Sequence, residues 1–278
     1  MAAARTRKSE CMASSDSKPV TVPDFLSARS RGVKLTMLTA YDYTTARLVD
    51  AAGVDSVLVG DSLGMVMQGH ANSLPVTLDD VLYHTRCVSR GVRRALLIAD
   101  MPFMSYQVSP EQAVTNAGRL MQEGGAHAVK LEGGVRMAKA VEAITRADIP
   151  VIGHVGLTPQ SVRRLGGFRV QRDERHILED ARAVADAGAF AVVLECVPAE
   201  TAAKVTASLP IPTIGIGAGA GCDGQVLVLQ DMLGMFDDFK PKFVKRYAEL
   251  GEAIRAAVRQ FCSEVQSKQF PADEHRFI

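Results

Sequence analysis

Four acidic residues stand at the ends of short apolar runs, in a pattern that suits a shared chemical task. They are Asp61, Asp100, Glu132 and Glu195. Each follows residues rich in Val, Leu, Ile and Ala, which are typical of buried parallel strands. Carboxylates gathered at one end of such strands repel one another and lose hydration, so they need a cation or shared protons. Oxygen ligands without a Cys/His cluster favour a hard ion, Mg²⁺ above all.

Helix capping is the competing interpretation of these acids. A loop that leads from a strand into a helix often ends on Asp, which accepts a hydrogen bond from the first helical turn. Asp61 is followed by Ser62 and Gly64, which suits such a cap. Capping explains one acid at a time, whereas a common site explains all four, and we therefore predict a common site.

The segment AVKLEGG, residues 128–134, carries two opposite charges on one face of a predicted strand. Lys130 and Glu132 are two residues apart, and alternate residues of a strand point to the same side. Two interpretations stay open at this point. The pair forms a simple inward salt bridge, or Lys130 faces an anionic substrate or a developing enolate while Glu132 lies near the metal.

Glu195 and two further side chains at or beside strand ends each have two possible roles. Glu195 follows the apolar run AVVL and is a candidate general base, with a Glu held by a neighbouring cation as the alternative. His154, in VIGHVGLTP, is explained equally well as a core residue and as a site residue. Cys196 suits a nucleophile by position, but a lone cysteine beside a buried strand is more often a packing residue.

The glycine-rich stretch GIGAGAGCDGQ, residues 215–225, follows the seventh predicted strand. A phosphate cradle is one interpretation, because the loops after strands seven and eight of α/β barrels often bind phosphate. No GK[ST] follows, so the stretch is not a P-loop. Close backbone packing is the other interpretation, and we favour it.

Short apolar or β-branched runs alternate with helical stretches along the chain. Strands that alternate with helices predict a parallel sheet, and eight such units in about 250 residues fit a closed barrel. An open, doubly wound sheet is the alternative. The predicted strands are residues 35–39, 56–60, 95–99, 128–131, 151–153, 191–194, 213–216 and 225–229. The predicted helices are residues 44–52, 78–90, 110–123, 135–146, 176–187, 199–208 and a long final helix at 240–267.

A weak internal repeat supports a common position for three of the acids. The segments AAGVDSVLVGD (51–61), EGGAHAVKLE (123–132) and DAGAFAVVLE (186–195) each join a glycine to a strand that ends on an acid. These are the second, fourth and sixth strands, and alternate strands of a barrel contribute side chains to the same layer. The repeat predicts that Asp61, Glu132 and Glu195 crowd one place near the C-terminal mouth.

Composition excludes several classes of protein. The chain has 278 residues, is 47% hydrophobic and has a formal net charge of +1. The near-neutral charge argues against a nucleic-acid partner, and no apolar run is long enough to predict a membrane span. The five cysteines lie far apart, which suits a reducing cytoplasm. Residues 1–20 are polar and predict a disordered tail, and residues 21–278 predict one catalytic barrel domain.

An ordered set of motifs resembles the ketopantoate hydroxymethyltransferase family. The set runs from about residue 35 to the C-terminus, and as an ordered series it is highly specific. Its members are MLTAYDYTTA, VLVGDSLGMVMQGH, ADMPFMSY, AVKLEGG, IGHVGLTPQS, LGGFRVQ, LECVPAE, IPTIGIGAG, CDGQVLVLQDMLG and FPADEH.

The resemblance implies a Mg²⁺-dependent (β/α)₈ TIM barrel with an N-terminal extension and a long C-terminal helix. It implies transfer of a hydroxymethyl group from 5,10-methylenetetrahydrofolate to 3-methyl-2-oxobutanoate, giving 2-dehydropantoate for pantothenate synthesis. It further implies a homo-oligomer, the ring-like decamer of the family, in the cytoplasm, with the 2-oxo acid and the folate as its small-molecule partners.

The same resemblance implies roles for individual residues. Asp61 and Asp100 look like metal ligands, and Glu132 looks like the third acid of the metal site, acting directly or through a water. The keto acid would contact Asp61, Ser62, Asp100, Lys130 and His154. Glu195 matches the proton acceptor.

A Mg²⁺-dependent C–C or C–P lyase of the isocitrate lyase and phosphoenolpyruvate mutase type is the alternative enzyme. Such a lyase is expected to carry a catalytic KKCGH-like motif, which this chain lacks. A third interpretation is a barrel kept only as a scaffold. That interpretation predicts the loss of some strand-end polar groups, and none of them is missing.

Overall fold

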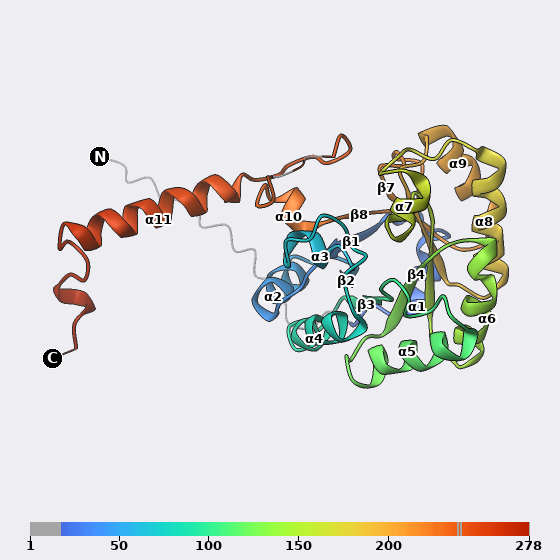
Figure 1. Ribbon diagram of the computed structural model, residues 1–278, viewed down its shortest axis with the longest axis horizontal. Helices are drawn as coiled ribbons and strands as arrows, with labels where there is room; N and C mark the ends of the chain where they lie inside the picture. Colours follow the sequence, from blue (N-terminus) through green and yellow to red (C-terminus); the bar gives the residue numbers. More distant parts are fainter. Residues whose placement is uncertain (1–17, 238, 240, 278) are drawn as a thin grey trace, which may run out of the picture.

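The computed structural model describes residues 18–237, 239 and 241–277. Eight parallel strands form a closed barrel in sequence order (Figure 1). The barrel confirms the predicted (β/α)₈ fold and excludes the open, doubly wound sheet. The strands are β1 (Leu35–Thr39), β2 (Ser56–Val59), β3 (Leu96–Asp100), β4 (Ala128–Glu132), β5 (Val151–Gly156), β6 (Ala191–Glu195), β7 (Thr213–Ile216) and β8 (Gly224–Leu227).

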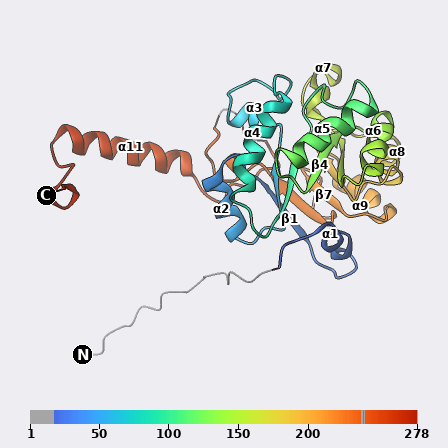
Figure 2. The same cartoon turned by 90° about the horizontal axis from the view of Figure 1, so that it is seen from below.

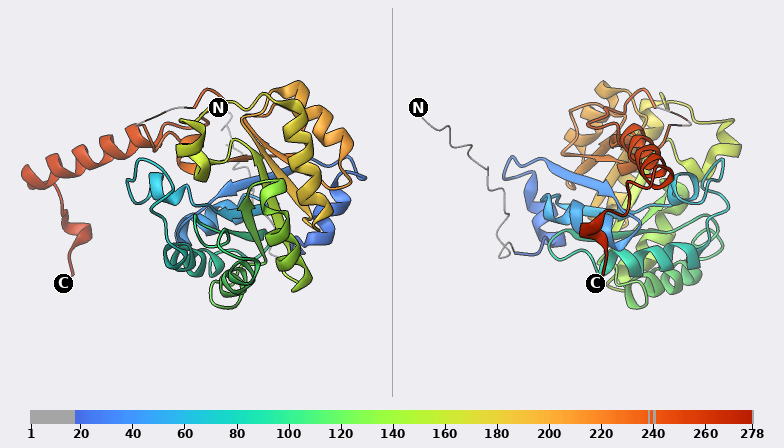
Figure 3. Two further views of the ribbon diagram at one scale, coloured as in Figure 1. Left: turned by 45° about the vertical axis from the view of Figure 1, so that its right-hand side comes forward. Right: turned by 90° about the vertical axis from the view of Figure 1, so that its left-hand side faces the viewer.

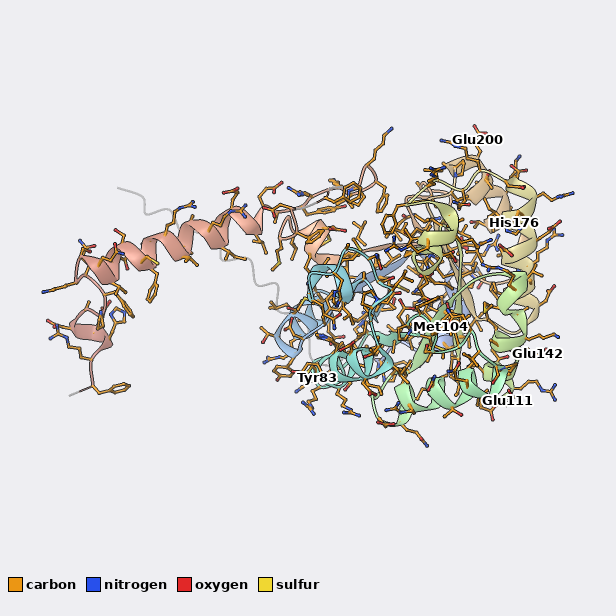
Figure 4. The ribbon with its side chains drawn as sticks, in the orientation of Figure 1. Tyr83, Met104, Glu111, Glu142, His176 and Glu200 are labelled. Carbon is orange, nitrogen blue, oxygen red and sulfur yellow. The ribbon has the colours of Figure 1, made fainter. Side chains whose placement is uncertain are left out.

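Helices follow the strands and cover the outside of the barrel, with polar residues such as Glu111, Glu142 and His176 on their outer faces (Figure 4). The α-helices are α1 (Val22–Ala28), α2 (Tyr43–Ala51), α3 (Leu63–Val66), α4 (Leu78–Ser89), α5 (Pro110–Gln122), α6 (Ala138–Arg146), α7 (Val162–Leu165), α8 (Glu174–Asp186), α9 (Ala199–Ser208), α10 (Leu229–Met232) and α11 (Leu250–Gln266). Three short 3₁₀ turns are η1 (Val135–Met137), η2 (Pro159–Ser161) and η3 (Asp273–His275).

Local sequence signals set where several helices begin. The Thr77 hydroxyl accepts a hydrogen bond from the Asp80 N–H, and the Asp80 carboxylate accepts one from the Thr77 N–H, which forms a capping box at the start of α4. The Ser109 hydroxyl caps α5 by accepting a hydrogen bond from the Gln112 N–H, without a reciprocal bond, and Pro110 occupies the first turn. These caps fix the angles at which the helices leave the loops above the barrel.

Helix α1 closes the N-terminal end of the barrel. Figure 2 places α1 at one end and α3 and α7 at the other. The Phe25 ring is fully buried and meets the Phe190 ring edge to face, with ring centroids 5.9 Å apart. The interior above them holds apolar side chains such as Ile98 and Ile152. The barrel is therefore a packed core at this end, and any opening must lie at the carboxyl ends of the strands.

Several boundaries differ from the predicted ones by a few residues, as for β5 and β8, and three other differences are larger or concern the ends of the chain. Helix α11 begins at Leu250, not at residue 240, because Pro241 and the segment after it run irregularly over the mouth of the barrel. The predicted helix 135–146 is split into η1 and α6. Residues 1–17 of the predicted tail lie outside the described residues, and its last residue, Val20, donates its N–H to the Arg94 carbonyl at 2.7 Å.

Helix α11 projects away from the barrel (Figures 1 and 3). Gly251, near its start, is its one buried residue. Among the residues that the structure describes, no helix combines the length and the apolarity needed to cross a membrane.

Candidate active site

A cavity of about 340 Å³ opens at the carboxyl ends of the strands. Every residue predicted for the site lines it, although these residues come from five different strands or the loops after them. They are Asp61, Ser62, Asp100, Lys130, Glu132, His154 and Glu195. All but Ser62 and Glu195 are buried, so a ligand in the cavity would meet charges that are largely shielded from water.

Strand register sets the height of each side chain in the barrel. Asp100 pairs with Lys130 across β3 and β4, and Glu132 pairs with His154 across β4 and β5. Both Lys130 and Glu132 line the cavity, as their two-residue spacing predicts. Glu195 lies two positions further along, opposite Gly156. The polar side chains therefore line one side of the cavity, and each lies further along its strand from β3 to β6.

Asp61 reaches the site by a different route from the one that the internal repeat predicts. Strand β2 ends at Val59, and Asp61 lies in the turn before α3. Its N–H donates to Asp100 Oδ2 at 3.1 Å, which holds this turn over the end of β3. The prediction that Asp61 shares a strand layer with Glu132 and Glu195 is therefore wrong. The extra residue in its repeat moves it off the strand, although it still lies in the cavity.

The capping interpretation of the four acids is also wrong. The side chains that cap the neighbouring helices belong to other residues, including Ser109 for α5. Ser62 stands at the start of α3 without a side-chain cap hydrogen bond. The Ser62 hydroxyl instead lies 2.8 Å from the hydroxyl of the buried Tyr41. None of the four acids caps the helix that follows its own strand, so their carboxylates can face the cavity.

Lys130 forms its salt bridge with Asp100 of the adjacent strand, at 2.9 Å between Nζ and Oδ1. Its Nζ also lies 3.3 Å from His154 Nδ1. Both members of the salt bridge are about 95% or more buried. Burial by itself lowers the pKa of Lys130, but Asp100, Glu132 and Asp61 outweigh burial and raise that pKa above its usual value. The Lys130 ammonium group is therefore a permanent positive charge in the site.

Two of the carboxyl groups resist ionisation in the metal-free protein. Burial raises the pKa of Asp100 to about 7, although the neighbouring Lys130 opposes the shift. Burial, together with the nearby Asp61, raises the pKa of Glu132 well above its usual value. Lys130 is a single buried lysine that faces several acids, whereas Lys242, which also lines the cavity, is exposed. A further cation among the acids would therefore lower the electrostatic free energy of the site.

His154 connects the floor of the site to Glu195. Its Nδ1 faces Lys130, and its Nε2 lies 3.2 Å from Glu195 Oε2. Burial, reinforced by the charge of Lys130, lowers the pKa of His154, so the ring is neutral near pH 7. Because Nδ1 faces the donor on Lys130, we assign the ring proton to Nε2, on the side of Glu195. The Nε2 contact is bent and leaves this buried atom without a well-aligned hydrogen bond.

Gln160 is a site residue that sequence analysis missed. Its N–H donates to Glu132 Oε2 and its Nε2 donates to Asp61 Oδ2, both at 3.0 Å. Its Oε1 accepts hydrogen bonds from the Tyr106 hydroxyl and from Gln107. Gln160 thus holds two carboxylates from distant parts of the chain. The quoted motif IGHVGLTPQS contains this residue, but no periodicity marks it, because it lies in a turn.

The donor set fits a hard cation that keeps part of its water shell. Within residues 18–237, 239 and 241–277, no three His, Cys, Asp or Glu side chains gather closely enough to hold a metal by themselves. Glu132 Oε1 and Asp100 Oδ1 are nevertheless buried without a hydrogen bond, since the contact of Asp100 with Lys130 is not aligned for one. Mg²⁺ binds through one or two carboxylates plus water and substrate oxygens, which this arrangement can provide.

Two other sequence features have structural explanations. Gly217 and Gly219 adopt positive φ angles of 63° and 77°, and a Cβ there would lie 2.8 Å from Phe243 and 2.5 Å from Ala199. These contacts favour the packing interpretation of the glycine-rich stretch. Burial, and then the charge of Glu195, raises the pKa of the Cys196 thiol to about 12, so Cys196 is not an activated nucleophile.

We expect the metal-free protein to lose stability as pH rises through about 7. The folded state holds a proton on Asp100 more tightly than the unfolded chain, whose carboxyl has a pKa of 3.8. This contribution is complete below about pH 4 and is lost as pH rises through about 7. Urea unfolding in EDTA should show a larger fall in stability between pH 5 and pH 8 for the parent than for Asp100→Asn. Mg²⁺ should stabilise the parent more at pH 8, and equal pH dependence in the two proteins would contradict the assignment.

Comparisons with known proteins agree on one family. The family model described as ketopantoate hydroxymethyltransferase matches residues 19–273. A 3-methyl-2-oxobutanoate hydroxymethyltransferase of Pelobacter propionicus is 58% identical over 263 residues, which cover 94% of this chain and 98% of that relative. Its counterpart from Syntrophus aciditrophicus is 56% identical, covering 95% and 98%. The counterpart from Clostridioides difficile is 54% identical, covering 92% and 95%.

Solved structures with the same fold are more distant in sequence. A phosphoenolpyruvate phosphomutase from Streptomyces platensis superposes with a TM-score of 0.61 at 16% identity, covering 93% of this chain and 92% of that one. A 2,3-dimethylmalate lyase superposes with a TM-score of 0.59 at 20% identity, covering 93% and 89%. At these identities the similarity shows the fold alone.

Proposed function

Since this chain belongs to the ketopantoate hydroxymethyltransferase family, we propose that it transfers a hydroxymethyl group from 5,10-methylenetetrahydrofolate to 3-methyl-2-oxobutanoate. The product is 2-dehydropantoate, an intermediate of pantothenate synthesis. One observation carries the proposal: a single cavity combines oxygen donors for a hard cation, the buried cation of Lys130, and the Glu195 carboxylate beside a neutral histidine.

Asp61 and Asp100 would hold Mg²⁺, with Glu132 close to the ion directly or through a water. When bound, the ion supplies Lewis-acid polarisation of the 2-oxo group. Gln160 supports this role, because its hydrogen bonds keep the carboxylates of Asp61 and Glu132 in fixed positions.

Glu195 would remove the proton from C3 of the oxo acid. C3 is tertiary and weakly acidic, so a positioned base is needed. The electron pair of the broken C–H bond forms the C2–C3 double bond, and negative charge moves onto the keto oxygen. Lys130 lies on the floor of the cavity, where it stabilises this oxygen. The hydroxyl and N–H of Ser62 would hold the substrate carboxylate, and the 3.2 Å contact of His154 Nε2 with Glu195 Oε2 would limit the orientations of Glu195.

The enolate carbon then attacks the one-carbon unit that the folate delivers. A new C–C bond forms, both C–N bonds of the folate's methylene bridge break, and water supplies the hydroxyl oxygen. The two folate nitrogens take up one proton from water and the proton held by Glu195, and tetrahydrofolate leaves. The apolar part of the cavity, which includes Val193 and Ile216, limits the access of water to the enolate before the attack.

The lyase alternative has support from the fold but not from the residues. The phosphomutase and the dimethylmalate lyase share the barrel with this chain at 20% identity or less. The cysteines of this chain stand in no KKCGH-like motif. Cys196, the cysteine that lines the cavity, carries a thiol held in its protonated form.

The reaction itself can be tested directly. The protein is incubated with Mg²⁺, 3-methyl-2-oxobutanoate and 5,10-methylenetetrahydrofolate, and the products are followed by NMR. We expect 2-dehydropantoate to accumulate with an equal amount of tetrahydrofolate. Absence of 2-dehydropantoate under conditions in which the protein is folded and binds Mg²⁺ would overturn the proposal.

We also propose that the protein is a homo-oligomer, in line with the decamer expected of the family, and that it acts in the cytoplasm. The projecting α11 supports an oligomer, because it carries an exposed apolar stripe at helical spacing. The stripe consists of Ile254, Val258, Phe261 and Val265, each about half exposed. The cysteines of the described residues are unpaired, which suits a reducing compartment.

Val258→Asp is expected to break the oligomer into smaller species, because it places a charge in the middle of this stripe. Sedimentation velocity at micromolar concentration would measure the change. Ser263→Asp is the matched control, since at 100° per residue Ser263 lies on the opposite face of α11. If both variants keep the parent's sedimentation coefficient, α11 is not an oligomer contact.

A further inference from the structure

Asp231 is an acid of the cavity that the proposed mechanism does not use. It lies in α10, just after β8, and lines the same cavity as Lys130 and Glu195. Within the described part of the chain, its carboxylate has no ion pair within 4.0 Å and no side-chain hydrogen bond. Burial raises its pKa to about 6, against the opposing charge of Arg246. Arg246 itself binds Glu249 and the Phe236 carbonyl.

Ser73 is a second polar group of the cavity without a partner. Its side chain is almost completely buried, and its Oγ has no hydrogen-bond partner among the residues that the structure describes. It lines the cavity together with Asp231. A buried hydroxyl without a hydrogen bond costs free energy, so Ser73 indicates a polar ligand. Asp231 is only partly buried, and it adds a carboxylate that faces the same cavity.

Apolar side chains line the cavity on the elements that adjoin Asp231. Helix α10 is held at the end of β1, because the Leu229 N–H donates to Thr39 Oγ1 at 3.0 Å. It meets the end of α3 where Gln230 Nε2 lies 3.8 Å from Met67 Sδ, and Figure 1 shows α10 beside α3. Met65 and Val66 of α3 and Phe236 after α10 line the same cavity. This combination of thioether, aromatic and aliphatic groups suits the face of a flat ring.

The cavity is larger than the oxo acid requires, so it leaves room for a second ligand. Its volume of about 340 Å³ falls in the range of sites for drug-sized ligands. The folate donor carries a reduced pteridine whose pyrimidine half is flat, and the edge of that half presents the 2-amino group and N3–H side by side. A carboxylate accepts two such parallel donors, as it does from the fork of an arginine.

We propose that Asp231 accepts hydrogen bonds from the 2-amino group and N3–H of the folate's pteridine ring, and that Ser73 binds another polar atom of the same ring. Met65, Val66 and Phe236 contact the faces of the ring. The inference rests on the proposed function, because it takes the folate as the second substrate. A structural role as an electrostatic partner of Arg246 is the competing account of Asp231.

Asp231→Asn tests the proposal, because the amide keeps the shape of the side chain but replaces one acceptor oxygen with an NH2 donor, so it cannot accept two parallel hydrogen bonds. We expect the Kd for tetrahydrofolate, measured by anaerobic titration calorimetry, and the KM for methylenetetrahydrofolate to rise about 10- to 100-fold. Exchange of the C3 proton of the oxo acid in D₂O needs no folate and should change less than about twofold. Asp186→Asn, on the exposed end of α8, is the matched control and should leave both quantities unchanged.

A folate analogue that lacks the 2-amino group separates recognition from structural damage. The parent should bind 2-desamino-2-methyltetrahydrofolate about 10-fold or more weakly than tetrahydrofolate, and Asp231→Asn should discriminate much less between the two. The inference is overturned if the variant binds tetrahydrofolate as tightly as the parent or discriminates between the two ligands as strongly. It is also overturned if the parent does not bind tetrahydrofolate. A different outcome separates the two proposals. If Asp231→Asn weakens tetrahydrofolate binding and reduces discrimination as expected, but the parent forms no 2-dehydropantoate, the proposed function fails and the folate site stands.

Discussion

Replacing Glu195 with glutamine is expected to slow exchange of the C3 proton of 3-methyl-2-oxobutanoate by about 100- to 10,000-fold. Glutamine fills the same volume and can still contact His154 Nε2, which lies 3.2 Å from Glu195 Oε2. It has no basic oxygen that can take a proton. The loss should therefore appear in the rate of proton removal, with little change in the affinity for the oxo acid or for Mg²⁺.

The measurement is NMR detection of deuterium at C3 in D₂O, with Mg²⁺ and without folate. Glu200→Gln is the matched control, because Glu200 lies on the outer surface of α9 (Figure 4) and should leave the exchange rate within about twofold of the parent. Equal exchange in Glu195→Gln and the parent would show that another group removes the proton. Exchange absent from the parent as well would remove the enolate from the mechanism.

Lys130→Met is expected to destabilise the metal-free protein by about 3 to 5 kcal/mol at pH 8. Methionine has a similar length but no charge, so Asp100 and Glu132 lose the cation that opposes their raised pKa values. The loss should be smaller at pH 5, where these carboxyl groups can take up protons. Enolate formation should also fall, because no fixed cation would face the keto oxygen.

Urea unfolding at both pH values, paired with C3 exchange in Mg²⁺, separates the two effects. We expect Mg²⁺ to recover part of the lost stability at pH 8 but not the exchange rate. Lys204→Met is the control, since Lys204 pairs with Glu174 on the exposed surface and should cost about 1 kcal/mol or less. If Lys130→Met costs no more than this control at pH 8, the buried salt bridge does not set the electrostatics of the site.

The sequence predicted the barrel because each strand and helix carries its own local pattern. Apolar runs of strand length, capping residues such as Thr77 and Ser109, and the alternation of elements are all encoded within a few residues of one another. The two-residue spacing of Lys130 and Glu132 likewise placed both in the cavity, because side-chain alternation is a property of the strand itself. The start of α11 was missed, since helical periodicity was extended across Pro241.

Relations between distant segments were decided only by the tertiary structure. The partner of Lys130 is Asp100, a choice that depends on the register of β3 against β4. Asp61 enters the site from a turn, and Gln160 joins it to Glu132 from a second turn about a hundred residues away. The course of each loop depends on how the whole barrel closes, and no short-range sequence periodicity predicts it.

The sequence by itself therefore determined which chemical groups stand at the carboxyl ends of the strands, because strand alternation is local. The tertiary structure decided how those groups are paired, which of them keep their protons, and that Asp231 and Ser73 line the same cavity, where the Ser73 hydroxyl has no hydrogen-bond partner among the described residues. The physical reason is that pairing and burial depend on distances across the closed barrel, and these distances are fixed only when all eight strands have met.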